Sequence, residues 1–139
     1  MTSSPALRWE DIAEGMEIIF PVCVSDDDMP RIALLSGDVS PLHTDEVFAG
    51  SKGYDGIVVY GGLLVSQISR LVGMHMPGRD SMEAGLEVKF ANPLFVNENA
   101  TLRAVVKHKH DSVRLLEIAF RIATPAKTVA HGVSRVLVR

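Results

Sequence analysis

The chain has 139 residues, 47% hydrophobic and 22% charged, with a formal net charge of −3. This length suits one domain over residues 1–139 with a buried core, and the composition excludes extensive disorder. The negative charge gives no electrostatic reason to expect nucleic acid or an anionic membrane as a partner.

The N-terminal half is expected to contain one strand and one short helix. Residues 1–15 form a polar lead-in with one aromatic anchor, Trp9, and lack the pattern of a secretory signal, so we expect a cytoplasmic protein. Residues 17–24 are a strand candidate, in which Pro21 indicates an edge or a bend. Cys23, the only cysteine, excludes an intrachain disulfide and is expected to be a small buried residue on that strand.

A helix is predicted to begin at the acidic stretch 25–28, whose short oxygen side chains can cap free N–H groups. Gly37 is expected to end it, and an apolar stripe follows one face, made of Met29, Ile32, Ala33 and Leu35. Residues 44–49 predict one or two helical turns capped by Thr44. Residues 50–56 contain three glycines and predict a loop.

The apolar run 57–73 predicts the long central helix. Its apolar residues cover nearly all sides, which is typical of a helix buried within a domain. Two adjacent glycines, Ser66 and Arg70 favour a central helix over a membrane span.

The remaining sequence predicts four strands in antiparallel connection. Residues 82–90 alternate apolar and polar side chains with a clean two-residue period. The other three strands are expected at 101–109, 113–123 and 128–138. Only the 57–73 helix is long and apolar enough to cover one face of the sheet, so the fold class is α+β, with about five strands curled around one helix.

Three stretches of the sequence resemble one family. SGDVSPLHTDEVFA resembles the SGD-x-NPLH-x-D motif of MaoC-like (R)-specific enoyl-thioester hydratases, and VVYGGLLVSQISRLVG resembles that family's I-V-H-G-M-L-x-x-S helix start. LEVKFANPLFVNENATLRAVV resembles its F-x-x-P-V-x-x-G-D strand pair. The resemblance spans residues 16–138 and implies a single hot-dog fold that works as a homodimer or a higher homo-oligomer.

The resemblance also implies site residues. The catalytic carboxylate and imidazole of the family fall on Asp38 and His43, and the glycine whose N–H polarises the thioester carbonyl falls on Gly61. A supporting helical serine falls on Ser66. This sequence departs from the family pattern at three positions expected to contact the substrate: Ser40, Tyr60 and Gly62.

These residue types suit hydration of a double bond conjugated to a thioester. Asp38 and His43 could share one water, one group accepting a proton and the other donating one. Burial is expected to raise the basicity of Asp38, because aspartate is a weak base in water. The Gly61 N–H, at a helix start, is expected to stabilise negative charge on the thioester oxygen.

Structural roles remain open for several of these residues. An Asp after a Gly is common in turns, the Gly61–Gly62 pair could serve helix packing, and Ser66 and Asp45 could serve only the local backbone. His108 and His110 share one strand face, where an exposed hairpin end is favoured over a metal site.

The resemblance thus predicts hydration of an enoyl thioester, or the reverse dehydration, without a metal or redox cofactor. Coenzyme A or an acyl-carrier phosphopantetheine would be part of the substrate, and Arg79 and Lys89 are candidates to meet its phosphates. One rival function is a hot-dog acyl-CoA thioesterase. The other is a non-catalytic subunit that binds acyl thioesters.

Overall fold

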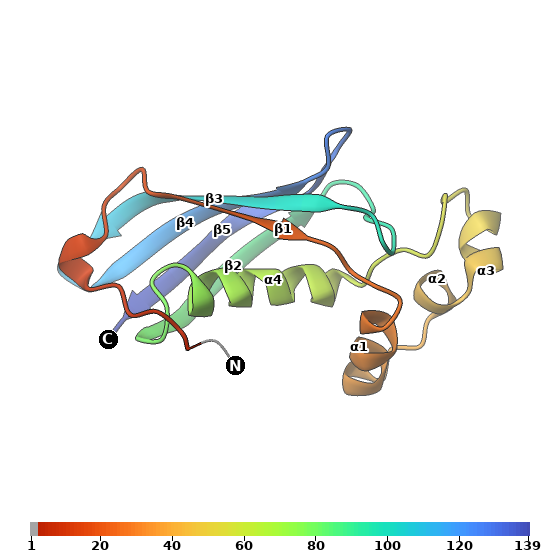
Figure 1. Cartoon of the computed structure of the whole chain (residues 1–139), viewed down its shortest axis with the longest axis horizontal. Coiled ribbons are helices and arrows are strands. Elements are labelled where there is room, and N and C mark those ends of the chain that lie inside the picture. Colours follow the sequence, from red (N-terminus) through yellow and green to blue (C-terminus); the bar gives the residue numbers. More distant parts are fainter. Residues whose placement is uncertain (1–2) are drawn as a thin grey trace.

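The computed structural model describes residues 3–139. Its core is one antiparallel sheet curled against one long helix (Figure 1). The elements, in chain order, are η1 (Trp9–Asp11), β1 (Glu17–Val22), α1 (Asp28–Ser36), α2 (Pro41–Thr44), α3 (Glu46–Ser51), α4 (Gly61–Met74), β2 (Ser81–Phe90), β3 (Ala100–His110), β4 (Leu115–Ala123) and β5 (Thr128–Val138). The predicted α+β architecture is confirmed.

The sheet has five strands in the order β1-β3-β4-β5-β2. Every neighbouring pair is antiparallel, and the predicted hairpin connection joins β3 to β4. β1 lies at one edge, which accommodates Pro21 because an edge strand can spare one N–H group. β2 forms the other edge, so within residues 3–139 one side of its backbone pairs with no other strand.

The central helix α4 begins at Gly61 and not at Ile57 as predicted. Residues 57–60 are extended, because the main chain of Val59 donates to Leu94 and that of Val96 donates to Ile57. The buried face of α4 consists of Leu64, Ile68, Leu71 and Val72. The helix is not buried on most sides as expected: Ser66, Ser69 and Arg70 are exposed, because one curled sheet covers one side of a helix.

The N-terminal segment is fastened to the β3–β4 hairpin. Trp9 is buried, and its indole N–H donates a hydrogen bond of 2.8 Å to Asp111. The ammonium of Lys109 donates to the carbonyl oxygens of Trp9 and Ile12, so the aromatic anchor is confirmed. Cys23 is exposed, contrary to prediction. β1 ends at Val22, and the chain there turns Val22 and Val24 inward and the cysteine outward.

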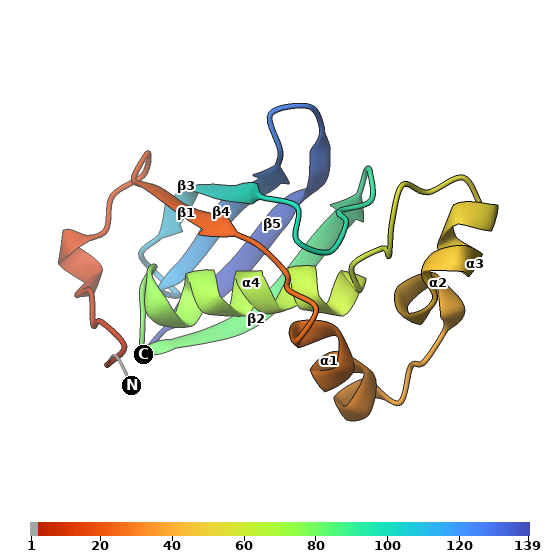
Figure 2. The ribbon, with the colours of Figure 1, turned by 45° about the vertical axis from the view of Figure 1, so that its right-hand side comes forward.

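Helices α1, α2 and α3, residues 28–51, form an overhang that lies beyond the start of α4 (Figure 1). In Figure 2, after a 45° turn, α2 and α3 lie beyond the start of α4, and α1 lies below it. α1 begins at Asp28, within the predicted stretch, but no side chain among the described residues caps its free N–H groups; Asp28 instead accepts hydrogen bonds from the N–H and hydroxyl of Ser25. Gly37 ends it in the left-handed conformation, with φ of 76°.

Two expectations for the overhang are wrong. The cap of α3 is Asp45 and not Thr44, since the Asp45 carboxylate accepts from the N–H groups of Val47 and Phe48. Leu35 does not join the apolar stripe of α1 but is 84% exposed, because α1 packs on only one side. Within residues 3–139, no helix has both the length and the hydrophobicity needed to cross a membrane.

Candidate active site

Asp38 follows the end of α1 and is held by its own neighbours. Its carboxylate accepts a hydrogen bond of 2.9 Å from the Ser40 N–H, and its own N–H donates to the Ser36 hydroxyl. Hydrogen bonding from Ser40 is the main reason that the pKa of Asp38 lies below its ordinary value, and attraction from His43 adds to the effect.

The expectation that burial raises the basicity of Asp38 is therefore wrong for the single chain. Asp38 is exposed, in the short stretch between α1 and α2. An exposed carboxylate with a lowered pKa is ionised at neutral pH. This carboxylate can accept a proton or bind a water molecule, but it has no proton to donate.

His43 lies in α2 with one ring nitrogen fixed. Its Nδ1 is 2.6 Å from the carbonyl oxygen of Val58. A carbonyl oxygen can only accept, so Nδ1 carries the hydrogen, and in the neutral imidazole the lone pair lies on Nε2. The second ring nitrogen is therefore an acceptor, which is the state needed to take a proton from water.

Tyr60 touches both of these residues. Its hydroxyl donates a hydrogen bond of 2.6 Å to the main-chain carbonyl of Asp38. Its ring stacks on the imidazole of His43, with centroids 4.1 Å apart and planes 26° apart. Tyr60 is buried, and this burial is the main cause of a pKa above its ordinary value.

His43 and Gly61 line one hollow of about 350 Å³, together with Tyr54 and Phe90. Gly61 is the first residue of α4, where N–H groups have no partner within the helix and the helix dipole is positive. A Cβ built on Gly61 would lie 3.2 Å from the ring of Phe90, so the glycine keeps this corner open.

A larger, mostly apolar hollow of about 630 Å³ lies on the overhang side of His43. Its apolar lining comes from α1 and from residues near the overhang, including Met29, Ala33, Val39 and Ile57. His43 thus lines both hollows. An imidazole between a polar corner and an apolar hollow can act on a substrate that has a polar head and a hydrocarbon tail.

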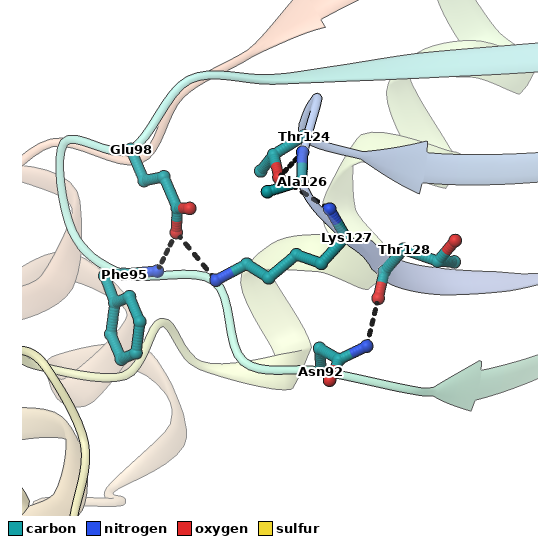
Figure 3. A network of polar contacts seen from close by, with 7 residues as sticks. All are labelled: Asn92, Phe95, Glu98, Thr124, Ala126, Lys127 and Thr128. Atoms are coloured by element: carbon teal, nitrogen blue, oxygen red, sulfur yellow. Dashed lines mark hydrogen bonds and ion pairs between the residues drawn. The ribbon is translucent and has the colours of Figure 1, made fainter.

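The loop 91–99 supports the extended residues 57–60 from behind. Val59 N–H donates to Leu94 and Val96 N–H to Ile57, which holds the Val58 carbonyl against His43. Figure 3 shows how this loop is tied to the β4–β5 turn by Lys127, whose ammonium lies 3.2 Å from the Glu98 carboxylate. Glu98 also accepts from the Phe95 N–H, and Asn92 donates to the Thr128 carbonyl.

The other residues predicted for the site have few or no contacts with Asp38 and His43. Ser66 is exposed and donates to Leu63 within α4. Arg79 follows the opposite end of α4 and pairs with Asp80. Lys89 is exposed on β2 beside Phe90, and Gly62 faces Ile32 of α1 at an ordinary contact distance. Ser40 contributes its main-chain N–H to Asp38.

Three features of the site could not be found from sequence patterns. The acceptor for His43 is a main-chain carbonyl, which carries no residue signature. Tyr54 and Phe90 reach the hollow from distant segments. His108 and His110 lie on the exposed end of β3 as predicted, and no cluster of three or more metal-binding side chains occurs within residues 3–139.

The chain is similar to known proteins over most of its length. The MaoC-like domain family model matches residues 11–132. An (R)-specific enoyl-CoA hydratase of Aeromonas caviae is 31% identical over 103 residues, covering 74% of this chain and 77% of the relative. A second (R)-specific enoyl-CoA hydratase, from Rhodospirillum rubrum, is 25% identical over 130 residues, covering 94% and 90%.

A solved structure shares the whole architecture. The (R)-hydratase from A. caviae involved in PHA biosynthesis superposes with a TM-score of 0.89 at 26% identity, covering 94% of this chain and 99% of that one. The fold is therefore the predicted hot-dog fold. With the family model spanning most of its length, the chain belongs to the MaoC-like domain family.

Proposed function

We propose that this protein is an enzyme that catalyses (R)-specific hydration of enoyl thioesters, or the reverse dehydration of 3-hydroxyacyl thioesters. The observation that carries the proposal is the His43 imidazole, whose Nδ1 bonds to the Val58 carbonyl, so that Nε2 is the ring nitrogen able to accept a proton from water. It lines the same hollow as Gly61, the first residue of α4. The naming of two relatives as (R)-specific enoyl-CoA hydratases supports the same reaction.

The proposed chemistry divides between three groups. Water attacks the β-carbon and gives one proton to the Asp38–His43 pair, and the pair then passes this proton to the α-carbon, so that the hydroxyl and the hydrogen of one water are added across the double bond. Negative charge that develops on the thioester oxygen meets the Gly61 N–H. One such donor is worth about 3–4 kcal/mol in the transition state.

The proposed substrate carries its acyl group on coenzyme A or on an acyl-carrier phosphopantetheine. Proton transfer and one N–H donor suffice for the reaction, so the proposal includes no metal or redox group. The apolar hollow beside His43 offers space for a hydrocarbon chain. Of the two cations proposed to meet phosphates, Lys89 lies next to Phe90 of the site, whereas Arg79 lies at the far end of α4. A coenzyme A substrate fits the expected cytoplasmic location.

We also propose a homodimer joined through β2. This strand is a sheet edge, and an unpaired edge is a template for pairing with another chain. Two large apolar side chains on it, Met82 and Phe90, are more than half exposed. Because Phe90 lines the hollow with His43 and Gly61, pairing of two copies at this edge would place each site near the interface.

The test is an assay with crotonyl-CoA and with longer or substituted enoyl-CoAs. We expect loss of the conjugated absorbance and a product of R configuration. Release of free thiol without loss of the double bond would instead establish a thioesterase. Tight binding of every acyl-CoA without turnover would establish a non-catalytic subunit.

A further inference from the structure

Tyr60 connects two parts of the molecule that the local backbone leaves independent. Asp38 and His43 belong to the overhang, whereas Tyr60 caps the start of α4. Its hydroxyl holds the main chain of Asp38, and its ring lies against His43. One side chain therefore contacts both residues proposed to move protons.

The side chain of Tyr60 is itself firmly placed. It is 4% exposed and belongs to the hydrophobic core. Two rotatable bonds in a packed core leave a tyrosine little freedom. The hydroxyl hydrogen is already donated to Asp38, and Tyr60 is not among the residues that line either hollow, so the contacts of this side chain are with the site residues.

The position of the overhang depends on contacts from outside it. Around Asp38 the hydrogen bonds are local, linking Ser36, Asp38 and Ser40 to one another. α2 has only four residues, so it contributes little rigidity of its own. Contacts from residues 57–60 therefore decide where the segment 38–43 lies.

Residues 57–60 also lead directly into Gly61, the third residue of the proposed site. Val58 accepts from His43, Tyr60 holds Asp38 and His43, and Gly61 follows directly in the chain. A displacement of about 1 Å between reacting groups can cost about a hundredfold in rate. A short rigid segment that touches all three limits such displacement.

We infer that Tyr60 is a positioning residue that fixes Asp38 and His43 relative to the Gly61 N–H, a role that rests on the proposed hydratase function. The hydroxyl places Asp38 and the ring places His43. Tyr60 acts through these two residues and does not itself touch the reacting atoms.

Tyr60→Phe tests the hydroxyl alone, since the ring that stacks on His43 is retained. We expect kcat for crotonyl-CoA to fall at least about tenfold while KM changes less than about threefold, because the geometry of catalysis changes and the hollow does not. The thermal midpoint should stay within a few degrees, because water can replace the hydroxyl at the exposed Asp38. Tyr60→Leu, which also removes the stacking on His43, should lower kcat further than Tyr60→Phe does.

Ser51→Ala is the matched control. Its hydroxyl also donates a 2.6 Å bond to a main-chain carbonyl of the overhang, that of Phe48, but touches neither Asp38 nor His43. Its kcat should equal that of the wild type. Equal losses in the two variants would overturn the inference, because any loosening of the overhang would then suffice.

A second measurement does not depend on turnover. Backbone order parameters from NMR should fall at Val39 and Ser40 in Tyr60→Phe, from rigid values near 0.85 toward flexible ones, and remain unchanged in α3. Wild-type kcat with unchanged order parameters would overturn the inference, and so would failure of Tyr60→Phe to fold. If the wild type itself lacks turnover, the proposed function is wrong, and the order parameters alone decide whether Tyr60 positions the segment.

Discussion

The Nδ1 atom of His43 lies 2.6 Å from the carbonyl oxygen of Val58, a residue 15 positions further along the chain. This bond fixes which ring nitrogen carries hydrogen and leaves Nε2 as an acceptor. It also joins the overhang to the extended residues 57–60, which precede α4. The tautomer of the proposed catalytic histidine is therefore a consequence of tertiary structure.

Asp38→Asn and His43→Ala should each lower turnover of crotonyl-CoA by at least about a hundredfold, the usual scale of general acid–base catalysis. Asparagine keeps an oxygen for the Ser40 N–H, so folding should survive, and circular dichroism checks this. Asp45→Ala is the control: it removes the α3 cap, costs about 1 kcal/mol of stability and should leave turnover unchanged. Near-wild-type turnover in either folded site variant would refute the assigned roles.

Gly61→Val should abolish most activity at little cost in stability. The new Cβ would press on the Phe90 ring at 3.2 Å, and this ring is the end of a side chain that is 56% exposed and free to shift. The added bulk narrows the hollow in front of the helix N–H groups. Turnover and thermal midpoint are measured on one preparation.

Gly73→Ala, near the other end of α4, is the control for this change. A Cβ there meets nothing within 4 Å, so stability should rise by up to about 1 kcal/mol and turnover should not change. If Gly61→Val unfolds easily but each folded molecule stays active, Gly61 serves packing and not the thioester oxygen.

His75 should make the fold sensitive to acid. It stacks on Phe20 with centroids 4.5 Å apart, and burial, assisted by Arg70, lowers its pKa below the ordinary value. The folded state therefore keeps the ring neutral, whereas the unfolded chain takes up a proton below about pH 6.5. This contribution to stability is complete above that pH and is lost as the pH falls toward the lower pKa of the folded state.

His75→Phe keeps the stacking but cannot titrate. Urea unfolding of both proteins at about pH 7.5 and about pH 5.5 compares their losses of stability on either side of the unfolded pKa. The wild type should lose more than the variant, since the remaining groups titrate in both. Identical losses would show that His75 does not titrate differently in the two states.

Lys127→Met should loosen the loop behind the site. The Lys127 ammonium meets Glu98 at 3.2 Å and lies 4.6 Å from the centre of the Phe95 ring, with both charged side chains mostly covered (Figure 3). Methionine keeps an apolar side chain of similar length. The expected loss of about 1 kcal/mol in the free energy of unfolding is therefore due to removal of the charge. Turnover should fall as well, because the loop supports residues 57–60.

Arg103→Met is its control, because the Arg103–Glu17 pair lies about half exposed at the sheet surface and away from the loop. A pair exposed to this extent is worth less than about 1 kcal/mol. Chemical denaturation measures both variants. A larger loss for Arg103→Met would contradict the role assigned to the Lys127–Glu98 pair.

Light scattering should give a mass of at least twice the 15.1 kDa of one chain. The physical reason is the unpaired β2 edge with its exposed apolar residues. Measurements at several protein concentrations, each with a parallel turnover assay, relate assembly to activity. A monodisperse monomer with full activity would contradict the proposed dimer.

Much of the fold could be predicted from local sequence patterns. The two-residue alternation of 82–90 predicted β2 to within one residue, because side chains in a strand point alternately to its two faces. Gly37 predicted the end of α1, since a left-handed residue there favours glycine. Pro21 predicted an edge or a bend because it lacks an N–H group, and β1 lies at an edge.

Predictions failed where neighbours in space outweighed the local pattern. Apolar residues alone extended α4 back to Ile57, but the loop 91–99 pairs with 57–60 and keeps that segment extended. Asp38 was expected to be buried because catalysis would benefit, yet the overhang leaves it exposed in the single chain.

The sequence by itself determined the order of the strands and helices, the family resemblance and the identity of the proposed Asp38, His43 and Gly61. These depend on periodicity, caps and motif spacing, which are properties of short stretches. Only the tertiary structure decided the His43 tautomer, the contacts of Tyr60 and the support from Lys127. Each of these depends on a partner far away in the chain, often a main-chain carbonyl, and such a partner has no signature in the order of the amino acids.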